Sequence, residues 1–240
     1  MSHIEFTGPP GSGKSAIHRK LIEDQQLFGG VSEGAIKRLF FNERSWKNRF
    51  LYYIMPSFFE YILCGGRPSK YRLEDRAFLQ FVDEYPEFFR ILSALMEGDN
   101  ERGKELYKKL RYTAEKYQLG ISAKREEEYL VMDEGFCKRA LYLVRFTNLK
   151  LLDYFEMVPL PKIVIHIDAP AKICRERQNE RGDIVVSEIE KLKKSREDWQ
   201  KIMNVIKTSF EISVVNIKNT GPIESSVSSV RKKLEEIIES

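Results

Sequence analysis

Short runs of hydrophobic residues alternate along the chain with longer stretches in which apolar positions recur at helical spacing. Four mostly apolar runs stand out, at residues 3–7, 129–132, 163–167 and 214–217. Runs of this length are typical of parallel strands that are buried on both faces of a sheet. A weaker second strand or a turn is predicted at residues 27–32.

Helices are predicted in the gaps between these runs. They cover residues 15–26, 135–155, 171–180, 187–207 and 223–239. The fourth helix begins with Ser187-x-x-Glu190, which fits a capping box. Strands that alternate with helices imply a parallel sheet. We therefore expect a three-layer α/β fold with a mostly parallel central sheet.

The stretch of residues 34–124 has a different character, because it is helical and rich in aromatic residues. Further helices are predicted at residues 73–96, with a break near Pro86, and at residues 100–117. Between residues 37 and 61, aromatic rings recur beside lysine and arginine. Rings at helical spacing usually belong to a core, and a stacking ring around a substrate is the alternative.

These patterns divide the chain into two parts. Residues 1–33 and 125–240 form the predicted α/β core, and residues 34–124 form a large helical insertion. A length of 240 residues suits one domain with such an elaboration.

Composition narrows the class of protein. No apolar run approaches the length of a membrane span, and the hydrophobic start is interrupted at once by Glu5, unlike a signal peptide. We therefore expect a cytoplasmic protein without a membrane partner. The net charge of +4 suits small anionic nucleotides as well as nucleic acid, and it leaves the oligomeric state open. Cys64, Cys137 and Cys174 lack the spacing of a metal site or a disulfide framework, so buried thiols are expected.

One motif carries specific chemistry. It matches G-x-x-x-x-G-K-[ST] in full, after a predicted strand and before a predicted helix. Backbone N–H groups of such a loop surround phosphate oxygens, while its lysine reaches the β and γ phosphates and its hydroxyl binds Mg²⁺. We expect ATP, or GTP in its place, to bind here with Mg²⁺. The binding residues are Gly8, Pro9, Pro10, Gly11, Ser12, Gly13, Lys14 and Ser15.

Two carboxylates follow the strand predicted at residues 129–132. Asp133 is placed to hold the same metal ion as Ser15, and Glu134 could share that task or act as a base. Acidic residues are also common in ordinary loops, so a purely structural role is the alternative.

Three arginines follow the strand predicted at residues 163–167. On a helix, Arg177 and Arg181 are four positions apart and share a face, while Arg175 lies elsewhere on the same helix. Arginine binds phosphate oxygens with a planar fork and keeps its charge, so this face could clamp a transferring phosphate. A solvated helix with glutamate partners is the alternative.

Together these motifs resemble the P-loop nucleoside and nucleotide kinases, especially their thymidylate kinase and deoxynucleoside kinase branches. The features that carry the likeness are the phosphate loop, Asp133, the segment 163–170 with its closing proline, and the arginine-rich segment 175–182. The resemblance implies that Arg177 and Arg181 belong to a lid over the phosphates. It also implies that Asn219 and Thr220, in the turn after the last strand, cup the adenine.

The same resemblance suggests a base for the reaction. The deoxynucleoside kinase branch carries a carboxylate at the end of its second strand, and Glu33 is positioned for that role. Glu134 is the alternative. The sequence departs from the family pattern after Asp133-Glu134, where Gly135 replaces the usual arginine, and the insertion matches no substrate motif.

The function predicted from these residues is transfer of the γ-phosphoryl group of ATP to a hydroxyl or phosphate of a small acceptor. Lys14, Asp133, the base and the lid arginines would be catalytic, and the acceptor would most naturally be a nucleoside or nucleotide. A kinase acting on a polynucleotide hydroxyl is an alternative supported by the cationic and aromatic residues 37–61. A nucleotide-dependent switch or assembly ATPase is another.

Overall fold

A computed structural model of the chain describes residues 3–23, 27–29, 34–35, 38–39, 68–97, 101–146, 149–182 and 188–239. Glu33, residues 40–61, Cys64 and Ser187 lie outside the described residues. The predictions for these positions therefore stay predictions.

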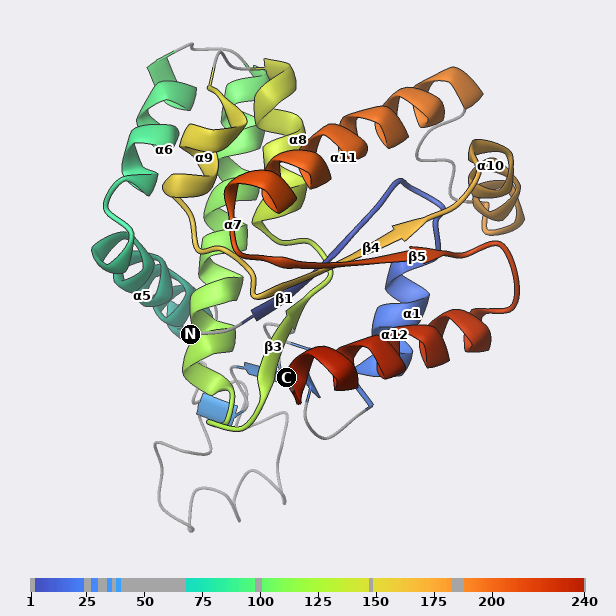
Figure 1. Cartoon of the computed structure of the whole chain (residues 1–240). Coiled ribbons are helices and arrows are strands. Elements are labelled where there is room, and N and C mark those ends of the chain that lie inside the picture. The colour runs from blue at the N-terminus through green and yellow to red at the C-terminus, as the bar shows by residue number, and fades with distance from the viewer. Residues whose placement is uncertain are drawn as a thin grey trace.

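A five-stranded sheet forms the middle layer, in the order β2-β3-β1-β4-β5 (Figure 1). All four strand pairs are parallel, with Ile4 of the central strand opposite Val131 on one side and Ile163 on the other. The strands are β1 (His3–Thr7), β2 (Leu27–Phe28), β3 (Tyr129–Met132), β4 (Ile163–Asp168) and β5 (Ser213–Lys218). The predicted parallel sheet is confirmed.

The helices cover both faces of this sheet. In Figure 1, α1 (Lys14–Leu21) and α12 (Ile223–Ile238) lie below it, while α8 (Phe136–Phe146) and α11 (Ile189–Ser209) lie above it. α7 (Glu101–Ala123) runs from above to below along the left-hand side of the view. Apolar side chains of β1 point down, where Ile4 and Phe6 pack with the core residues of α1 and α12. The predicted three-layer α/β fold is therefore confirmed.

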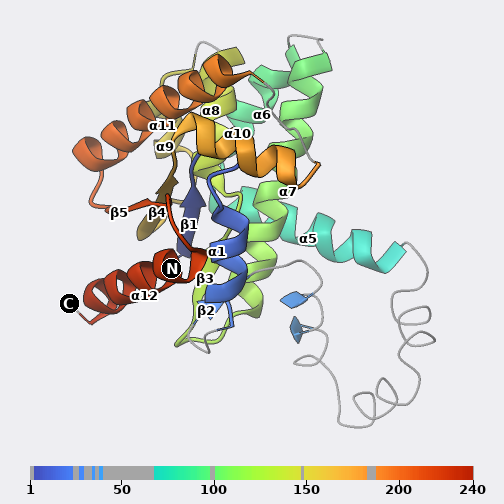
Figure 2. The same cartoon turned by 90° about the vertical axis from the view of Figure 1, so that its right-hand side faces the viewer.

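The described residues 68–97 and 101–123 are mostly helical, where helices were predicted at residues 73–96 and 100–117. α5 (Pro68–Glu84) and α6 (Phe88–Glu97) pack against α7, and their break coincides with Pro86. Figure 2 shows α5 extending away from the sheet. Phe81 stacks on Phe136 with ring centroids 5.6 Å apart and meets Tyr117 edge-on at 5.8 Å. These three rings are core residues. The aromatic residues between 40 and 61 lie outside the described residues, so the choice between a core and a stacking ring stays a prediction there.

One helix prediction needs correction. The single helix predicted at residues 135–155 is wrong, because the structure has α8 and then a separate α9 (Leu151–Glu156). Lys150 has an extended backbone and is the N-cap of α9. The apolar spacing runs on because both helices pack on one core, where Tyr154 and Phe155 are buried. α11 begins at Ile189 with Glu188 as its N-cap, and the capping box predicted at Ser187 lies outside the described residues.

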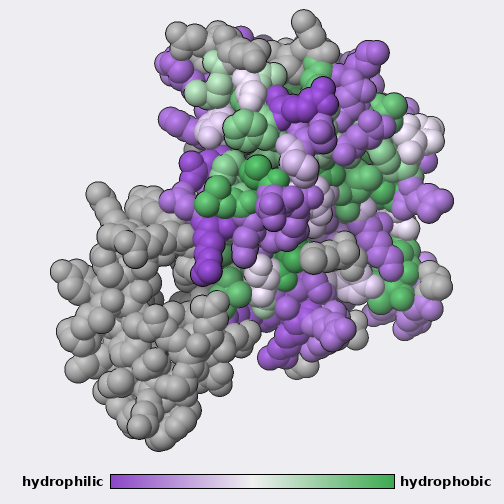
Figure 3. Space-filling view, turned by 90° about the vertical axis from the view of Figure 1, so that its left-hand side faces the viewer, coloured by the Kyte–Doolittle hydropathy of each residue, from purple (hydrophilic) through white to green (hydrophobic). Residues whose placement is uncertain are grey.

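The remaining elements complete the frame of the site. α10 (Ala171–Glu180) follows β4, and its buried Cys174 and the buried Cys137 of α8 are both free thiols, as expected. Among the described residues, no helix is long and apolar enough to cross a membrane. On the face shown in Figure 3, hydrophilic residues lie between smaller groups of hydrophobic ones.

Candidate functional site

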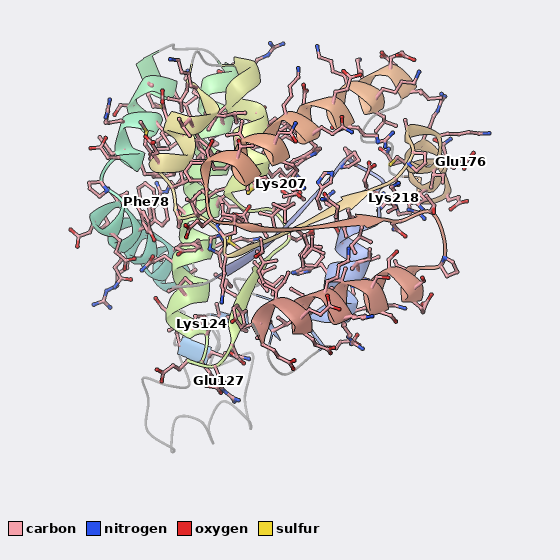
Figure 4. All side chains as sticks on the ribbon, in the orientation of Figure 1. Phe78, Lys124, Glu127, Glu176, Lys207 and Lys218 are labelled. Atoms are coloured by element: carbon pink, nitrogen blue, oxygen red, sulfur yellow. The ribbon has the colours of Figure 1, made fainter. Side chains whose placement is uncertain are left out.

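The carboxyl ends of the parallel strands meet at one edge of the sheet, where ligands bind in open α/β folds. Figure 4 marks this edge with Lys218 at the end of β5 and Glu176 on the neighbouring α10. The phosphate loop follows β1 at this edge, in the middle of the sheet.

The phosphate loop is enclosed by protein on the side of β4 and β5. Gly11 and Gly13 both have positive φ angles, of 80° and 92°. A Cβ atom at Gly11 would overlap the carbonyl oxygen of Cys174, and one at Gly13 would overlap the side-chain amide of Asn219. The glycines therefore allow a close approach of the loop to α10 and to the turn after β5.

Asn219 holds the phosphate loop in place. Its side chain is buried, and Nδ2 donates a 2.7 Å hydrogen bond to the carbonyl oxygen of Ser12. Ser226 donates to its Oδ1 at 3.0 Å. The structure thus engages this side chain with the loop, whereas the resemblance assigned it to adenine. Thr220 beside it is exposed.

Arg177 contacts the same part of the loop. Its Nη1 donates to the carbonyl oxygens of Asn219 at 3.1 Å and Ser12 at 3.4 Å. Arg181 is exposed, and its Nε donates to the carbonyl oxygen of Arg177 at 3.3 Å. Arg175 is also exposed on α10. Arg177 is therefore bound to the loop and Arg181 contacts Arg177, whereas Arg175 is exposed elsewhere on α10.

On the other side of the loop, two predicted metal ligands lie together. The hydroxyl of Ser15 donates to Oδ2 of Asp133 at 2.9 Å, across 118 positions of sequence. The Oδ1 atom of Asp133 is buried and has no hydrogen-bond partner among the described residues. A hydroxyl and a carboxylate with an unused oxygen fit Mg²⁺, which prefers oxygen ligands and keeps waters and phosphates as the others. The described residues hold no cluster of three or more His, Cys, Asp or Glu for a metal.

Lys14 is partly buried at the start of α1, where Nζ donates to the carbonyl oxygen of Pro9 at 3.3 Å. Burial lowers the pKa of its ammonium, Lys138 lowers it further, and Asp133 and Glu134 oppose the shift. A bound phosphate would supply the negative charge that this ammonium lacks. The site is therefore electrostatically arranged for an anion.

A cavity of about 570 Å³ opens beside the metal ligands, which we call the Asp133 cavity. α1, the end of β3 and α7 form its walls. In the strand order, β3 lies on one side of β1, and β4 and β5 lie on the other. The cavity, next to β3, and Asn219, after β5, are therefore on opposite sides of the phosphate loop. Six of its lining residues are Ser15, His18, Arg19, Tyr112, Lys116 and Arg139.

Comparison with known proteins identifies the fold. No family model and no curated protein matches the chain. Among solved structures, deoxyadenosine kinase from M. mycoides with bound dCTP matches with a TM-score of 0.50 at 11% identity, covering 98% of this chain and 99% of that chain. The chain has the deoxynucleoside kinase fold. The same enzyme with products dCMP and a flexible dCDP matches with a TM-score of 0.46 at 13% identity, over 98% and 99% of the two chains.

Two cationic side chains engage Glu134, one of the two candidate bases. It is ion-paired with Lys138, and Arg139 lies 3.5 Å from its other oxygen. Burial raises the pKa of Glu134, but the hydrogen bond and charge of Lys138 and the charge of Arg139 outweigh burial, so its pKa lies below the usual value. A carboxylate that is paired twice is a weak proton acceptor.

Arg139 is a candidate site residue that the sequence pattern does not indicate. The kinase pattern led us to seek an arginine directly after Asp133-Glu134, and Gly135 stands there. α8 begins one residue after Gly135 and places the buried Arg139 beside Glu134. Its Nε donates to Oγ1 of Thr113 on α7 at 2.8 Å. The signal available in the sequence is its spacing, one helical turn and a residue beyond Glu134.

Proposed function

We propose that this protein is an ATP-dependent kinase that transfers the γ-phosphoryl group to a hydroxyl or phosphate of a small acceptor, a nucleoside or nucleotide. One observation carries the proposal. The Asp133 cavity opens onto the same Ser15–Asp133 pair that stands beside the phosphate loop. A donor loop and an acceptor cavity that share one metal position are the arrangement that in-line phosphoryl transfer requires.

On the donor side, each element has a role. Backbone N–H groups of residues 8–15 would bind the phosphates, and Lys14 would reach the β and γ groups. Ser15 and Asp133 would hold Mg²⁺, which neutralises phosphate charge when it is bound. Arg177 fixes the loop from behind, and the exposed Arg175 and Arg181 on α10 remain candidates for closing over the phosphates.

On the acceptor side, support comes from fold-level analogy as well as from the cavity. The matching deoxyadenosine kinase structures contain dCTP, and dCMP with dCDP. By analogy, a nucleoside or nucleotide suits the Asp133 cavity of this chain, whose volume lies within the usual range for small ligands. Thr220 stays a candidate contact for adenine, and Glu33 stays a candidate base.

The proposal is tested by direct product detection. Purified protein with Mg²⁺ and ATP or GTP is incubated with a panel of nucleosides, nucleotides and sugars, and mass spectrometry searches for acceptors that gain one phosphate. Lys14→Ala is the control, because Lys14 is proposed to contact the phosphates and burial disfavours its charge in the free protein. Lys14→Ala should keep the unfolding midpoint and lose the product. No phosphorylated acceptor with the wild-type protein would refute the proposal.

A further inference from the structure

The charged side chains around the Asp133 cavity are not balanced. Arg19, Lys116 and Arg139 are cationic, while Asp133 and Glu134 are the carboxylates. His18 adds no charge at neutral pH, since burial lowers the pKa of its ring and outweighs the opposing charge of Asp133. The described lining of the cavity therefore carries more positive than negative charge before any ligand binds.

Both carboxylates of the cavity already have positive or hydrogen-bonding partners. Glu134 is ion-paired with Lys138 and lies 3.5 Å from Arg139. Asp133 accepts the Ser15 hydrogen bond and faces the position proposed for Mg²⁺. Neither carboxylate is therefore left to pair with Arg19 or Lys116.

Among the described residues, Lys116 and Arg19 are the two cavity cations without a carboxylate partner. Lys116 is half-buried on α7, with Nζ 4.4 Å above the centre of the Tyr112 ring. Among the described residues no carboxylate lies within ion-pair distance of it, and the same holds for the exposed Arg19. The ammonium of Lys116 is therefore available to bind an anionic ligand in the cavity.

Arg139 adds a buried donor to the same wall. Its side chain is 5% exposed, and its Nε is bonded to Thr113, which fixes the guanidinium at the cavity. A planar guanidinium and a neighbouring ammonium are the groups that bind a phosphate with charge-assisted hydrogen bonds.

Resting on the proposed function, we propose that the acceptor is itself a phosphomonoester, a nucleoside monophosphate, and that Lys116 and Arg139 bind its phosphate in the Asp133 cavity. The volume of about 570 Å³ accommodates a ligand of this size. The product is then a diphosphate rather than a monophosphate.

The chemistry of the site agrees with this acceptor. An oxygen of its phosphate attacks the γ-phosphorus and forms a new P–O bond, while the bond from the γ-phosphorus to the β–γ bridging oxygen breaks and its electron pair leaves with ADP. Because the second pKa of such a phosphate is about 6, the attacking oxygen is mostly unprotonated at neutral pH. No base is then required. A hydroxyl acceptor must lose a proton, and both described carboxylates of the cavity are engaged.

The test compares matched pairs of acceptors. Each common nucleoside and deoxynucleoside is assayed beside its 5′-monophosphate, with Mg²⁺ and ATP. We expect kcat/KM to be at least about 100-fold higher for the preferred monophosphate than for its nucleoside, because charge-assisted hydrogen bonds are the strong ones. Lys116→Gln should raise the KM for the monophosphate about tenfold and leave the KM for ATP within about twofold.

Lys108→Gln is the matched control. Lys108 is exposed two turns earlier on α7 and does not line the cavity, so both KM values should stay unchanged. A nucleoside that is phosphorylated better than its monophosphate overturns the inference and leaves the proposed function intact. If Lys116→Gln raises the KM for the nucleoside and for its monophosphate by the same factor, the inference is also overturned and the proposed function is unaffected.

A binding measurement separates the two hypotheses further. If no acceptor gains phosphate, the proposed function fails, and calorimetric titration with the monophosphates then decides the inference. Binding that is about tenfold weaker in Lys116→Gln than in the wild type would support a phosphomonoester site. Absent binding, or equal binding to both proteins, would overturn it.

Discussion

The carboxylate of Glu5 accepts a hydrogen bond from the backbone N–H of Phe136 at 2.8 Å. Its second oxygen accepts one from the N–H of Cys137, also at 2.8 Å, and the side chain is fully buried. The first N–H groups of a helix have no intrahelical partner and carry positive potential, so a carboxylate is well placed there. The strand that leads into the phosphate loop is thereby joined to the helix that follows Asp133.

This relationship predicts the effect of Glu5→Gln. The oxygen of the glutamine side chain can accept from the N–H of Phe136 or from that of Cys137. Its N–H₂ group then faces the other N–H, which loses its hydrogen-bond acceptor. We expect the free energy of unfolding to fall by about 2–4 kcal/mol, measured by urea denaturation. Glu190→Gln removes an exposed carboxylate and should leave the midpoint unchanged. Equal stability of Glu5→Gln and wild type would show that the carboxylate does not anchor α8.

Gly135→Ala probes the same junction from the other side. A Cβ atom at Gly135 would overlap the Glu5 carboxylate, which is held by its two hydrogen bonds. We expect a loss of about 2 kcal/mol or more and a higher Mg²⁺ requirement, because the Asp133 loop must shift. Gly221→Ala is the matched control, since nothing lies within 4 Å of its added Cβ. A neutral Gly135→Ala would contradict the proposed rigidity of this junction.

The sheet and the phosphate loop could be predicted because short-range signals determine them. An apolar run, a complete glycine motif and a helix start lie within residues 3–21, and their order fixes the loop at the end of β1. Asp133 was found for the same reason, since it directly follows a buried strand. Its distance from Ser15 follows from parallel strands whose carboxyl ends share one edge.

The role of Glu5 could not be predicted, because it depends on a partner 131 positions away. In the sequence, Glu5 only interrupts an apolar run. The alternation of side chains along β1 places His3, Glu5 and Thr7 opposite the apolar pair Ile4 and Phe6, on the face toward α8. Arg139 and Lys116 could not be predicted as site residues for a similar reason. They line one cavity because α7 packs against α8, and this contact is not visible in the sequence.

Asn219 yields a prediction that separates two roles. If it braces the loop through Ser12, Asn219→Ala should weaken binding of inorganic tripolyphosphate and of ATP by the same factor, roughly tenfold for one buried hydrogen bond. If it contacts adenine, ATP alone should be affected. Thr220→Ala is the exposed neighbour for comparison and should change ATP binding alone. Calorimetric titration of both ligands measures the four affinities.

His166 makes stability depend on pH. It is 6% exposed beneath Trp199, and its Nδ1 lies 3.1 Å from the Thr7 hydroxyl. Burial lowers its pKa to about 4, with Asp168 opposing and nearby cations assisting. An unfolded chain has a histidine pKa of about 6.5 and therefore binds more protons between these values. The contribution of His166 is fully present above pH 6.5 and is lost as the pH falls toward 4.

We therefore expect the wild-type protein to lose about 2 kcal/mol more than His166→Gln when the pH is lowered from 7.5 to 5, from the difference between the two pKa values. Urea denaturation at both pH values measures this slope, and a constant loss of stability in the variant does not alter it. His18 titrates in the same direction in both proteins, so it cancels in the comparison. If the free energy of unfolding of the wild type and of His166→Gln changed equally with pH, burial would not hold this ring neutral. An imidazole NMR titration of His166 with a midpoint near 6.5 would show the same.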